Sequence, residues 1–111
     1  VHDIGIKASE EKYGSCAGNY QELEGPPLAK EMLTRLGFDP DVTERVCYLV
    51  GHHHTYSGIN ADDYRMLVEA DLIVNIQEDD ITAESAYAAC GKYFRSKSAI
   101  AFLHRLFEPY P

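Results

Sequence analysis

A histidine and an aspartate stand side by side near the start of the chain, as His2-Asp3. Neutral imidazole and carboxylate are good ligands for divalent ions of intermediate hardness. Adjacent side chains usually point in different directions, but a turn at a helix end lets both reach one centre, and Gly5 gives the backbone the freedom for such a turn. The doublet is therefore a candidate metal site. Taken alone, it fits equally well the end of a helix that carries a histidine and an aspartate without a ligand.

Two later segments offer the same kinds of side chain. Asp71 stands in the middle of an apolar stripe, and a carboxylate there is costly unless it is paired or bound to a metal. His53 falls on the apolar face of another expected helix, with His52 one step round it. His54 is expected to face solvent and is given no role. A cationic side chain paired with Asp71, and ordinary hydrogen bonds for the histidines, are the structural alternatives.

The segment 13–21, YGSCAGNYQ, is a further candidate site. Gly14 and Gly18 could allow backbone N–H groups to form an anion-binding nest. Cys16 could act as a nucleophile with a histidine partner. A glycine-containing surface turn is the alternative interpretation of the same residues.

The elements that must position these residues are predicted to be helices. Residues 8–25 lack a sustained apolar period, and we expect them to form a long ordered loop. Apolar periodicity and capping residues predict five helices. They cover 26–36 with Gly37 as the stop, 40 to about 53 after Asp39, 62–76 after Asn60, about 82–94 after Thr82, and about 96–107 after Ser96. No segment shows sustained strand alternation, so the expected fold is all-α with short connections.

Composition limits the class of protein. With 111 residues, the chain fits a single domain over 1–111. A net charge of −8 argues against a nucleic-acid or anionic-membrane surface, so no nucleic acid and no membrane are expected as partners. The three cysteines are far apart and no apolar run approaches a bilayer span, which favours a cytoplasmic protein. Because the chain begins at Val1, directly on the doublet, we expect an upstream segment to precede it.

The order of these segments resembles the HD-domain superfamily of metal-dependent phosphohydrolases. The matching stretches are HDIGI from His2, CYLVGHHH with His52-His53, VEADLIVN with Asp71, and the helix GPPLAKEMLTRLG between them. The resemblance covers about residues 1–76. It implies an all-α, HD-domain-like bundle of about five helices, truncated at its N-terminus.

The resemblance also implies a ligand set. Similar proteins hold a divalent ion (Mn, Ni, Co, Fe or Mg) through an upstream histidine, the doublet and the late aspartate, which correspond here to His2, Asp3 and Asp71. The upstream histidine is not in this chain. Two departures matter: Ile6 stands where many relatives have lysine, and Gln21 stands where the two-metal branch often has histidine. These departures favour a mononuclear site.

The function expected from this resemblance is hydrolysis of a small phosphorylated substrate, such as a phosphoester or nucleotide. His52 or His53 would bind the substrate phosphate or donate a proton to the leaving oxygen. Lys7 or Lys12 would neutralise phosphate charge. The alternative is a non-catalytic nucleotide- or metal-binding regulatory module of the same fold, and a weaker one is a Cys16 nucleophile.

Overall fold

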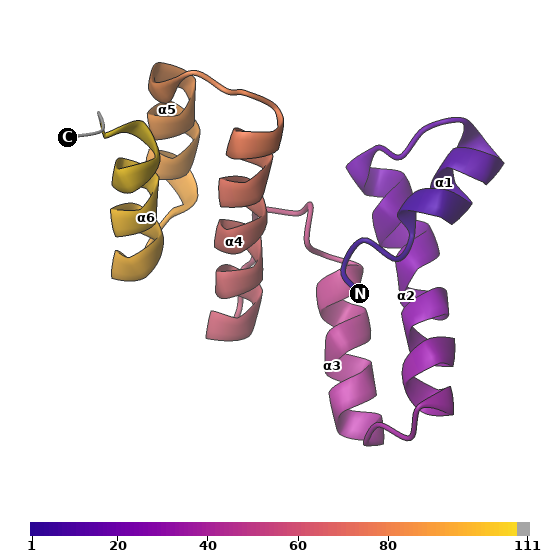
Figure 1. Ribbon diagram of the computed structural model, residues 1–111. Helices are drawn as coiled ribbons and strands as arrows, with labels where there is room; N and C mark the ends of the chain where they lie inside the picture. Colours follow the sequence, from indigo (N-terminus) through magenta and orange to yellow (C-terminus); the bar gives the residue numbers. More distant parts are fainter. Residues whose placement is uncertain (109–111) are drawn as a thin grey trace. The chain divides into compact units, whose positions relative to one another are not determined.

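The computed structural model describes residues 1–108, and over that range it contains six helices, joined by turns and loops, and no strand (Figure 1). The helices are α1 (Ile6–Tyr13), α2 (Gly18–Arg35), α3 (Pro40–Val50), α4 (Asp62–Glu78), α5 (Ala83–Tyr93) and α6 (Lys97–Phe107). The all-α prediction is confirmed. The chain divides into two compact units, Val1–Gly58 and a second from Ile59 onward, and each is described by itself.

In the first unit, α2 packs against both α1 and α3. Gly37 ends α2 as predicted: its φ is +81°, and the Phe38 amide donates to the Leu33 carbonyl at 3.1 Å, which closes the last turn. Asp39 then caps α3, because its carboxylate accepts from the Asp41 amide at 2.9 Å and Pro40 occupies the first turn. These local signals set the α2–α3 hairpin.

The predicted loop over 8–25 is wrong, because α1 and the first half of α2 occupy most of it. Pro26 and Pro27 were expected in a first turn but lie inside α2. Having no amide hydrogen, they leave two carbonyls of the preceding turn without intrahelical donors. The helix nevertheless continues, since α2 packs along its length between α1 and α3 and the Cys47 thiol donates to the Pro26 carbonyl at 3.5 Å. Tertiary packing here overrides a local stop signal.

In the second unit, α4, α5 and α6 pack around an apolar core. The core residues are Ile76, Ala86, Cys90, Phe94, Ala99 and Leu103. Thr82 and Ser96 cap α5 and α6 as predicted, accepting from the amides of Ser85 at 3.3 Å and Ala99 at 3.1 Å. The Asn60 cap is wrong, because Ala61 holds the N-cap position of α4 and no side chain caps it.

Glu69 of α4 is a buried carboxylate at the start of α6. One carboxylate oxygen accepts from the amides of Arg95 at 2.6 Å and Ser96 at 3.1 Å, and the other accepts from the Ser96 hydroxyl at 2.6 Å. Burial alone raises the pKa of Glu69, but these hydrogen bonds outweigh it and hold the pKa below its ordinary value. The carboxylate therefore joins α4 to α6 in its charged form.

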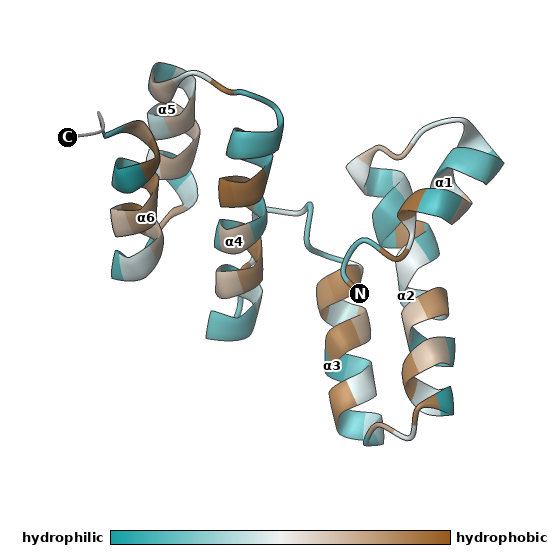
Figure 2. Ribbon diagram, viewed as in Figure 1, coloured by the Kyte–Doolittle hydropathy of each residue, from teal (hydrophilic) through white to brown (hydrophobic). Residues whose placement is uncertain are grey.

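Hydropathy follows this arrangement. Figure 2 shows hydrophobic segments along α3 and α4, whereas α1 is mostly hydrophilic. Within residues 1–108, no helix combines the length and apolar character that crossing a bilayer requires. All three cysteines are free thiols.

Candidate metal centre

The loop that carries the doublet crosses the middle of α2 at very close range. A Cβ on Gly5 would lie 2.8 Å from the Gly25 amide nitrogen and 2.9 Å from the Gln21 carbonyl oxygen, both backbone atoms of α2. Only a residue without a side chain fits at this crossing. The turn is closed by the Ile6 amide, which donates to the Asp3 carbonyl at 3.1 Å. The close crossing therefore fixes where the doublet lies on the first unit.

The three consecutive histidines lie in the turn after α3 and not on that helix. α3 ends at Val50, and the prediction that the helix extends to His53 is wrong. The turn is closed by the Thr55 amide, which donates to the His52 carbonyl at 2.8 Å. The Thr55 hydroxyl lies 2.8 Å and 3.0 Å from the two carboxylate oxygens of Glu22, which attaches the turn to α2. The histidine side chains are consequently not spaced at helical intervals.

His53 faces Asp3. The His53 ring is fully buried; its Nδ1 lies 2.8 Å from the Val50 carbonyl, and its Nε2 lies 3.5 Å from Asp3 Oδ1. A carbonyl oxygen can only accept, so Nδ1 must carry the proton, and in the neutral ring Nε2 holds the lone pair. Among the described residues, Nε2 makes no hydrogen bond. An acceptor nitrogen therefore faces a carboxylate, an arrangement that a cation between them would stabilise.

His54 belongs to the same cluster, which corrects the expectation that it faces solvent without a role. Its side chain is half-buried, and one ligand atom from each of Asp3, His53 and His54 lies within 4.8 Å of the other two. His54 Nε2 lies 3.1 Å from Gln21 Oε1. A Cβ on Gly18 would lie 2.7 Å from His54 Cβ, so this glycine makes room for the ring. We call Asp3, His53 and His54 the triad.

His2 lies beside the triad. Its Nε2 is 3.3 Å from Asp3 Oδ2, and its ring meets the His53 ring edge-on at a centroid distance of 5.3 Å. The side chains of His2 and Asp3 therefore lie close to each other. Both also approach His53, which lies in the turn after α3.

The other predicted residues of the first unit lie elsewhere or carry other contacts. His52 stacks on Tyr48 at 4.0 Å, and its Nδ1 lies 2.6 Å from the Tyr48 carbonyl. Lys7 is exposed on α1. Lys12 donates to Glu24 at 2.9 Å, and the same carboxylate oxygen accepts from the Tyr13 hydroxyl at 2.7 Å. These two bonds hold the pKa of Glu24 below its ordinary value.

Asp71 lies on α4, in the second unit, where it is half-buried. Its approach to the doublet stays a prediction from the sequence.

The segment 13–21 connects α1 to α2, and the glycine nest stays a prediction from the sequence. Gly14 ends α1 with a φ of +68°, and Gly18 begins α2. Cys16 is exposed, and its carbonyl oxygen accepts from Gln21 Nε2 at 2.7 Å. The segment therefore serves as a helix–helix connection whose backbone holds Gln21.

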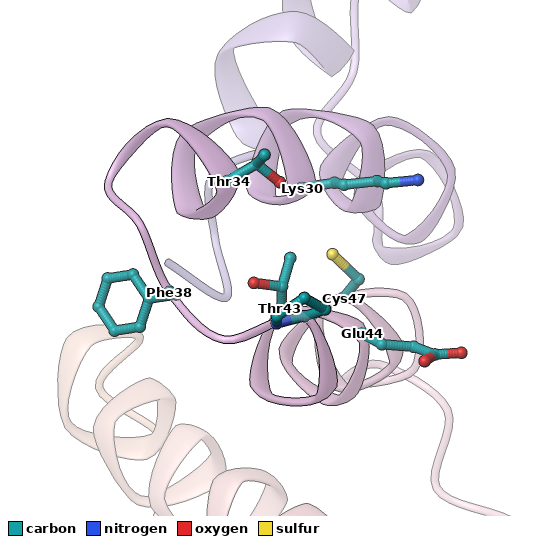
Figure 3. A pocket seen from close by; sticks show the side chains of 7 residues that line it. Lys30, Thr34, Phe38, Thr43, Glu44 and Cys47 are labelled. Atoms are coloured by element: carbon teal, nitrogen blue, oxygen red, sulfur yellow. The ribbon is translucent and has the colours of Figure 1, made fainter.

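A pocket of about 480 Å³ lies between α2 and α3, away from the histidine turn. Figure 3 shows Thr43 and Cys47 of α3 pointing toward α2, which contributes Thr34 and Lys30. Its lining has one amine and one carboxylate but no cluster of histidines. It is mainly apolar space between two helices, and we do not assign it the chemistry of the triad.

Sequence reasoning missed His54, Gln21 and Gly18 as parts of one arrangement. The pairs that join them are 33 and 36 residues apart along the chain, so no local pattern indicates them. In the sequence, only the run of histidines indicated that His54 belongs to a site.

Comparison of this chain with protein-family models, with curated proteins and with solved structures finds no match.

Proposed function

We propose that this chain is a metal-dependent phosphohydrolase of the HD-domain type. The resemblance of HDIGI, GHHH and VEADLIVN to that superfamily supports the activity. The triad supports the location of the ion. In this proposal Asp3, His53 and His54 of the triad bind a divalent ion together with His2, and Asp71 enters as a further ligand from the sequence resemblance alone.

One observation carries the proposal: the acceptor nitrogen of buried His53 faces Asp3 Oδ1 at 3.5 Å. Two ligands of a single tetrahedral ion, each bound at about 2.1 Å, lie roughly 3.4 Å apart. The separation therefore suits coordination to one ion. The His53 Nδ1–H bond to the Val50 carbonyl fixes the ring as metal-binding histidines are commonly fixed. One carboxylate with imidazoles suits Mn, Fe, Co, Ni or Zn better than Ca.

The chemistry follows from these groups. A bound divalent ion supplies polarisation of a phosphoryl oxygen and a nucleophilic water at neutral pH. Asp3 provides negative charge that holds the ion, and it lies at the chain's surface, where substrate can approach. His52, whose Nδ1 donates to the Tyr48 carbonyl, would contact a phosphate oxygen or transfer a proton to the leaving oxygen in its doubly protonated form, which carries a hydrogen on Nε2 as well. The exposed Lys7 amine supplies positive charge to an otherwise acidic chain.

The test measures binding and turnover in the same samples. Mn²⁺, Co²⁺, Ni²⁺ and Mg²⁺ are titrated calorimetrically into the chain, and hydrolysis of p-nitrophenyl phosphate and a nucleotide panel is followed. Asp3→Asn and His53→Gln are expected to lose both binding and hydrolysis. The matched controls are Asp41→Asn, at an exposed site on α3, and His104→Gln, on α6, which are expected to keep both. Equal losses in the controls, or none in the triad variants, would refute the proposal.

Asp71→Ala isolates the part of the proposal that rests on resemblance. We expect this variant to bind the ion more weakly and to lose hydrolysis. Unchanged metal stoichiometry and affinity would remove Asp71 from the ligand set and leave the first-unit ligands in place.

A second candidate is a non-catalytic nucleotide- or metal-binding module. It is favoured by the Lys12–Glu24 pair, which commits one of the two expected phosphate-neutralising cations to a carboxylate. A rise in melting temperature with metal and nucleotide, without any turnover across the panel, would select this candidate.

A further inference from the structure

We infer that Gln21 is a positioning residue that sets which nitrogen of His54 carries the proton in the neutral ring and which one keeps the lone pair that can bind a metal ion. The inference rests on the proposed function, because it concerns how one side chain of the metal centre is prepared. Gln21 is 6% exposed and lies in the first half of α2. Both ends of its amide are used, and the two contacts together leave a single consistent assignment of donors and acceptors.

The first contact fixes the amide. One end of the Gln21 amide lies 2.7 Å from the Cys16 carbonyl oxygen. A backbone carbonyl only accepts, so this end must be the NH₂ group, and the other end must be the oxygen. Rotating the amide by half a turn would set two oxygens against each other in a buried place, which is costly.

The second contact then fixes the histidine. Gln21 Oε1 lies 3.1 Å from His54 Nε2. Because this oxygen only accepts, His54 Nε2 must carry the proton, and in the neutral ring the lone pair belongs to Nδ1. His54 therefore uses the opposite nitrogen from His53, whose Nδ1 donates to the Val50 carbonyl. The carbonyl of Cys16 thus determines, through Gln21, the tautomer of a ring 38 residues further along the chain.

The position of the His54 ring is fixed as well as the nitrogen that carries its proton. The ring of His54 packs where a side chain on Gly18 would stand, with Cβ and Cγ at 2.7 and 2.8 Å from that point. The His53 and His54 rings lie 4.0 Å apart. Gln21 and Gly18 lie one turn apart on α2, so one helix face holds the ring from two sides. Partners of this kind typically change metal affinity by about 10- to 100-fold when they are removed.

The test is a double-mutant cycle on Co²⁺ affinity, measured by calorimetry and by the visible spectrum of the bound ion. Gln21→Leu keeps the volume but removes both hydrogen bonds, and we expect it to weaken Co²⁺ binding about 10- to 100-fold. Gln21→Glu keeps an oxygen for His54 Nε2 but sets its second oxygen against the Cys16 carbonyl, so it should restore only part of the affinity. His54→Ala should weaken binding at least as much as Gln21→Leu. In the His54→Ala background, adding Gln21→Leu should change the affinity no further, because Gln21 acts only through that ring.

Three results would overturn the inference: full affinity in Gln21→Leu, full affinity in His54→Ala, or equal losses from Gln21→Leu with and without His54. The last result would mean that the glutamine only supports the fold. If Gln21→Leu fails to fold, Gln21→Asn replaces it, since one missing methylene prevents the amide from reaching both partners. Absence of Co²⁺ binding to the unsubstituted chain would instead refute the proposed function. Co²⁺ binding to the unsubstituted chain is therefore measured first, before the variants are compared.

Discussion

When the His53 ring is neutral, Asp3 and His53 face each other through two atoms that both accept hydrogen bonds. The carboxylate oxygen and the His53 Nε2 lone pair are 3.5 Å apart, and the His53 proton is committed to the Val50 carbonyl. Without a cation, this arrangement costs free energy, because neither atom can satisfy the other. Groups that oppose each other in this way are typical of sites organised for a ligand rather than for stability.

Asp3→Asn separates stability from binding at this position. The new amide donates a hydrogen bond to His53 Nε2, so we expect the metal-free chain to gain about 1 kcal/mol in unfolding free energy. The same change removes the charge that holds the ion, so the rise in melting temperature on adding Mn²⁺ should disappear. Thermal unfolding with and without Mn²⁺ measures both the gain in metal-free stability and the loss of the rise in melting temperature. A metal-free variant that is less stable than the parent chain would contradict this reading of the His53 lone pair.

At the scale of residues, the sequence predicted which side chains could belong to the site better than it predicted what each of them contacts. His2 and Asp3 were predicted as metal ligands and His53 as a catalytic side chain, and these three do lie together in the first unit. Helical spacing continued through the turn places His54 toward solvent, so the sequence did not indicate it as a site residue. The helix in fact stops at Val50. Which nitrogen each histidine presents could not be predicted, since it depends on carbonyls and an amide brought close only by folding.

The crossing of Gly5 over α2 is the element-scale feature on which the triad depends. Gly5 has a φ of −82°, a conformation open to any residue, so its requirement is one of space alone. A side chain there would push the doublet loop away from the backbone of α2. The position of Asp3 relative to His53 would change with it.

Gly5→Ala is therefore expected to destabilise the first unit by about 1–3 kcal/mol and to weaken Mn²⁺ binding. Gly91 is the matched control, because it lies inside α5 and nothing is within 4 Å of its added Cβ. Gly91→Ala should stabilise the chain by up to about 1 kcal/mol, since alanine is the better helix former. Urea unfolding followed by circular dichroism measures both. Equal effects of the two substitutions would argue against a steric requirement at Gly5.

Glu69 makes the second unit sensitive to acid. Its pKa is lower in the folded chain than the ordinary value of 4.5, so the unfolded chain binds more protons between those two values. The stabilisation is fully present above 4.5 and is lost as the pH falls through the folded-state pKa. Glu69→Gln, which cannot accept the same charge-assisted bonds, should cost about 2 kcal/mol near neutral pH and flatten this dependence. Unfolding free energy measured from pH 7 to pH 3 tests it.

The control for this prediction is Glu78→Gln, at the exposed end of α4. We expect its unfolding free energy to stay within about 0.5 kcal/mol of the parent chain at neutral pH. A flattening of the acid response as large as that of Glu69→Gln would mean that general charge, and not the α6 amides, causes the response.

Helices that begin with a capping residue were predicted well from the sequence. Helices that depend on packing against other helices were not. Asp39, Thr82 and Ser96 each accept from an amide two or three residues on, which is a short-range signal. α1 and the first half of α2 have no such cap and little apolar periodicity. Their contacts include the hydrogen bonds of Lys12 and Tyr13 to Glu24 and the stacking of Tyr13 on Tyr20. Paired prolines also suggested a helix start where the chain in fact continues.

At the scale of the whole molecule, the candidate ligands are divided between two compact units. The triad and His2 belong to the first, and Asp71 belongs to the second. Because a ligand stabilises the folded state that binds it, the response of each unit to metal reports which residues hold the ion.

Hydrogen exchange with and without Mn²⁺ is expected to show slower exchange in the amides around His53 and in the doublet loop. If Asp71 is a ligand, the amides of α4 should be protected as well, by about 2.7 kcal/mol at a hundredfold excess over the dissociation constant. Asp71→Ala should abolish the protection of α4 and keep part of that in the first unit. Protection confined to residues 1–58 would limit the ligands to the first unit.

The three adjacent histidines have a final consequence for how this chain tolerates copying errors. His52 and His53 each donate through Nδ1 to a carbonyl near the end of α3, while His54 donates through Nε2 to a glutamine. Loss or duplication of one codon in the repeat would leave a run that still looks rich in histidine. After a loss, however, two rings would have to serve three different surroundings, and after a duplication the added residue would shift the ring next to Gln21. Slippage in this short repeat should therefore be as damaging as replacing a ligand outright.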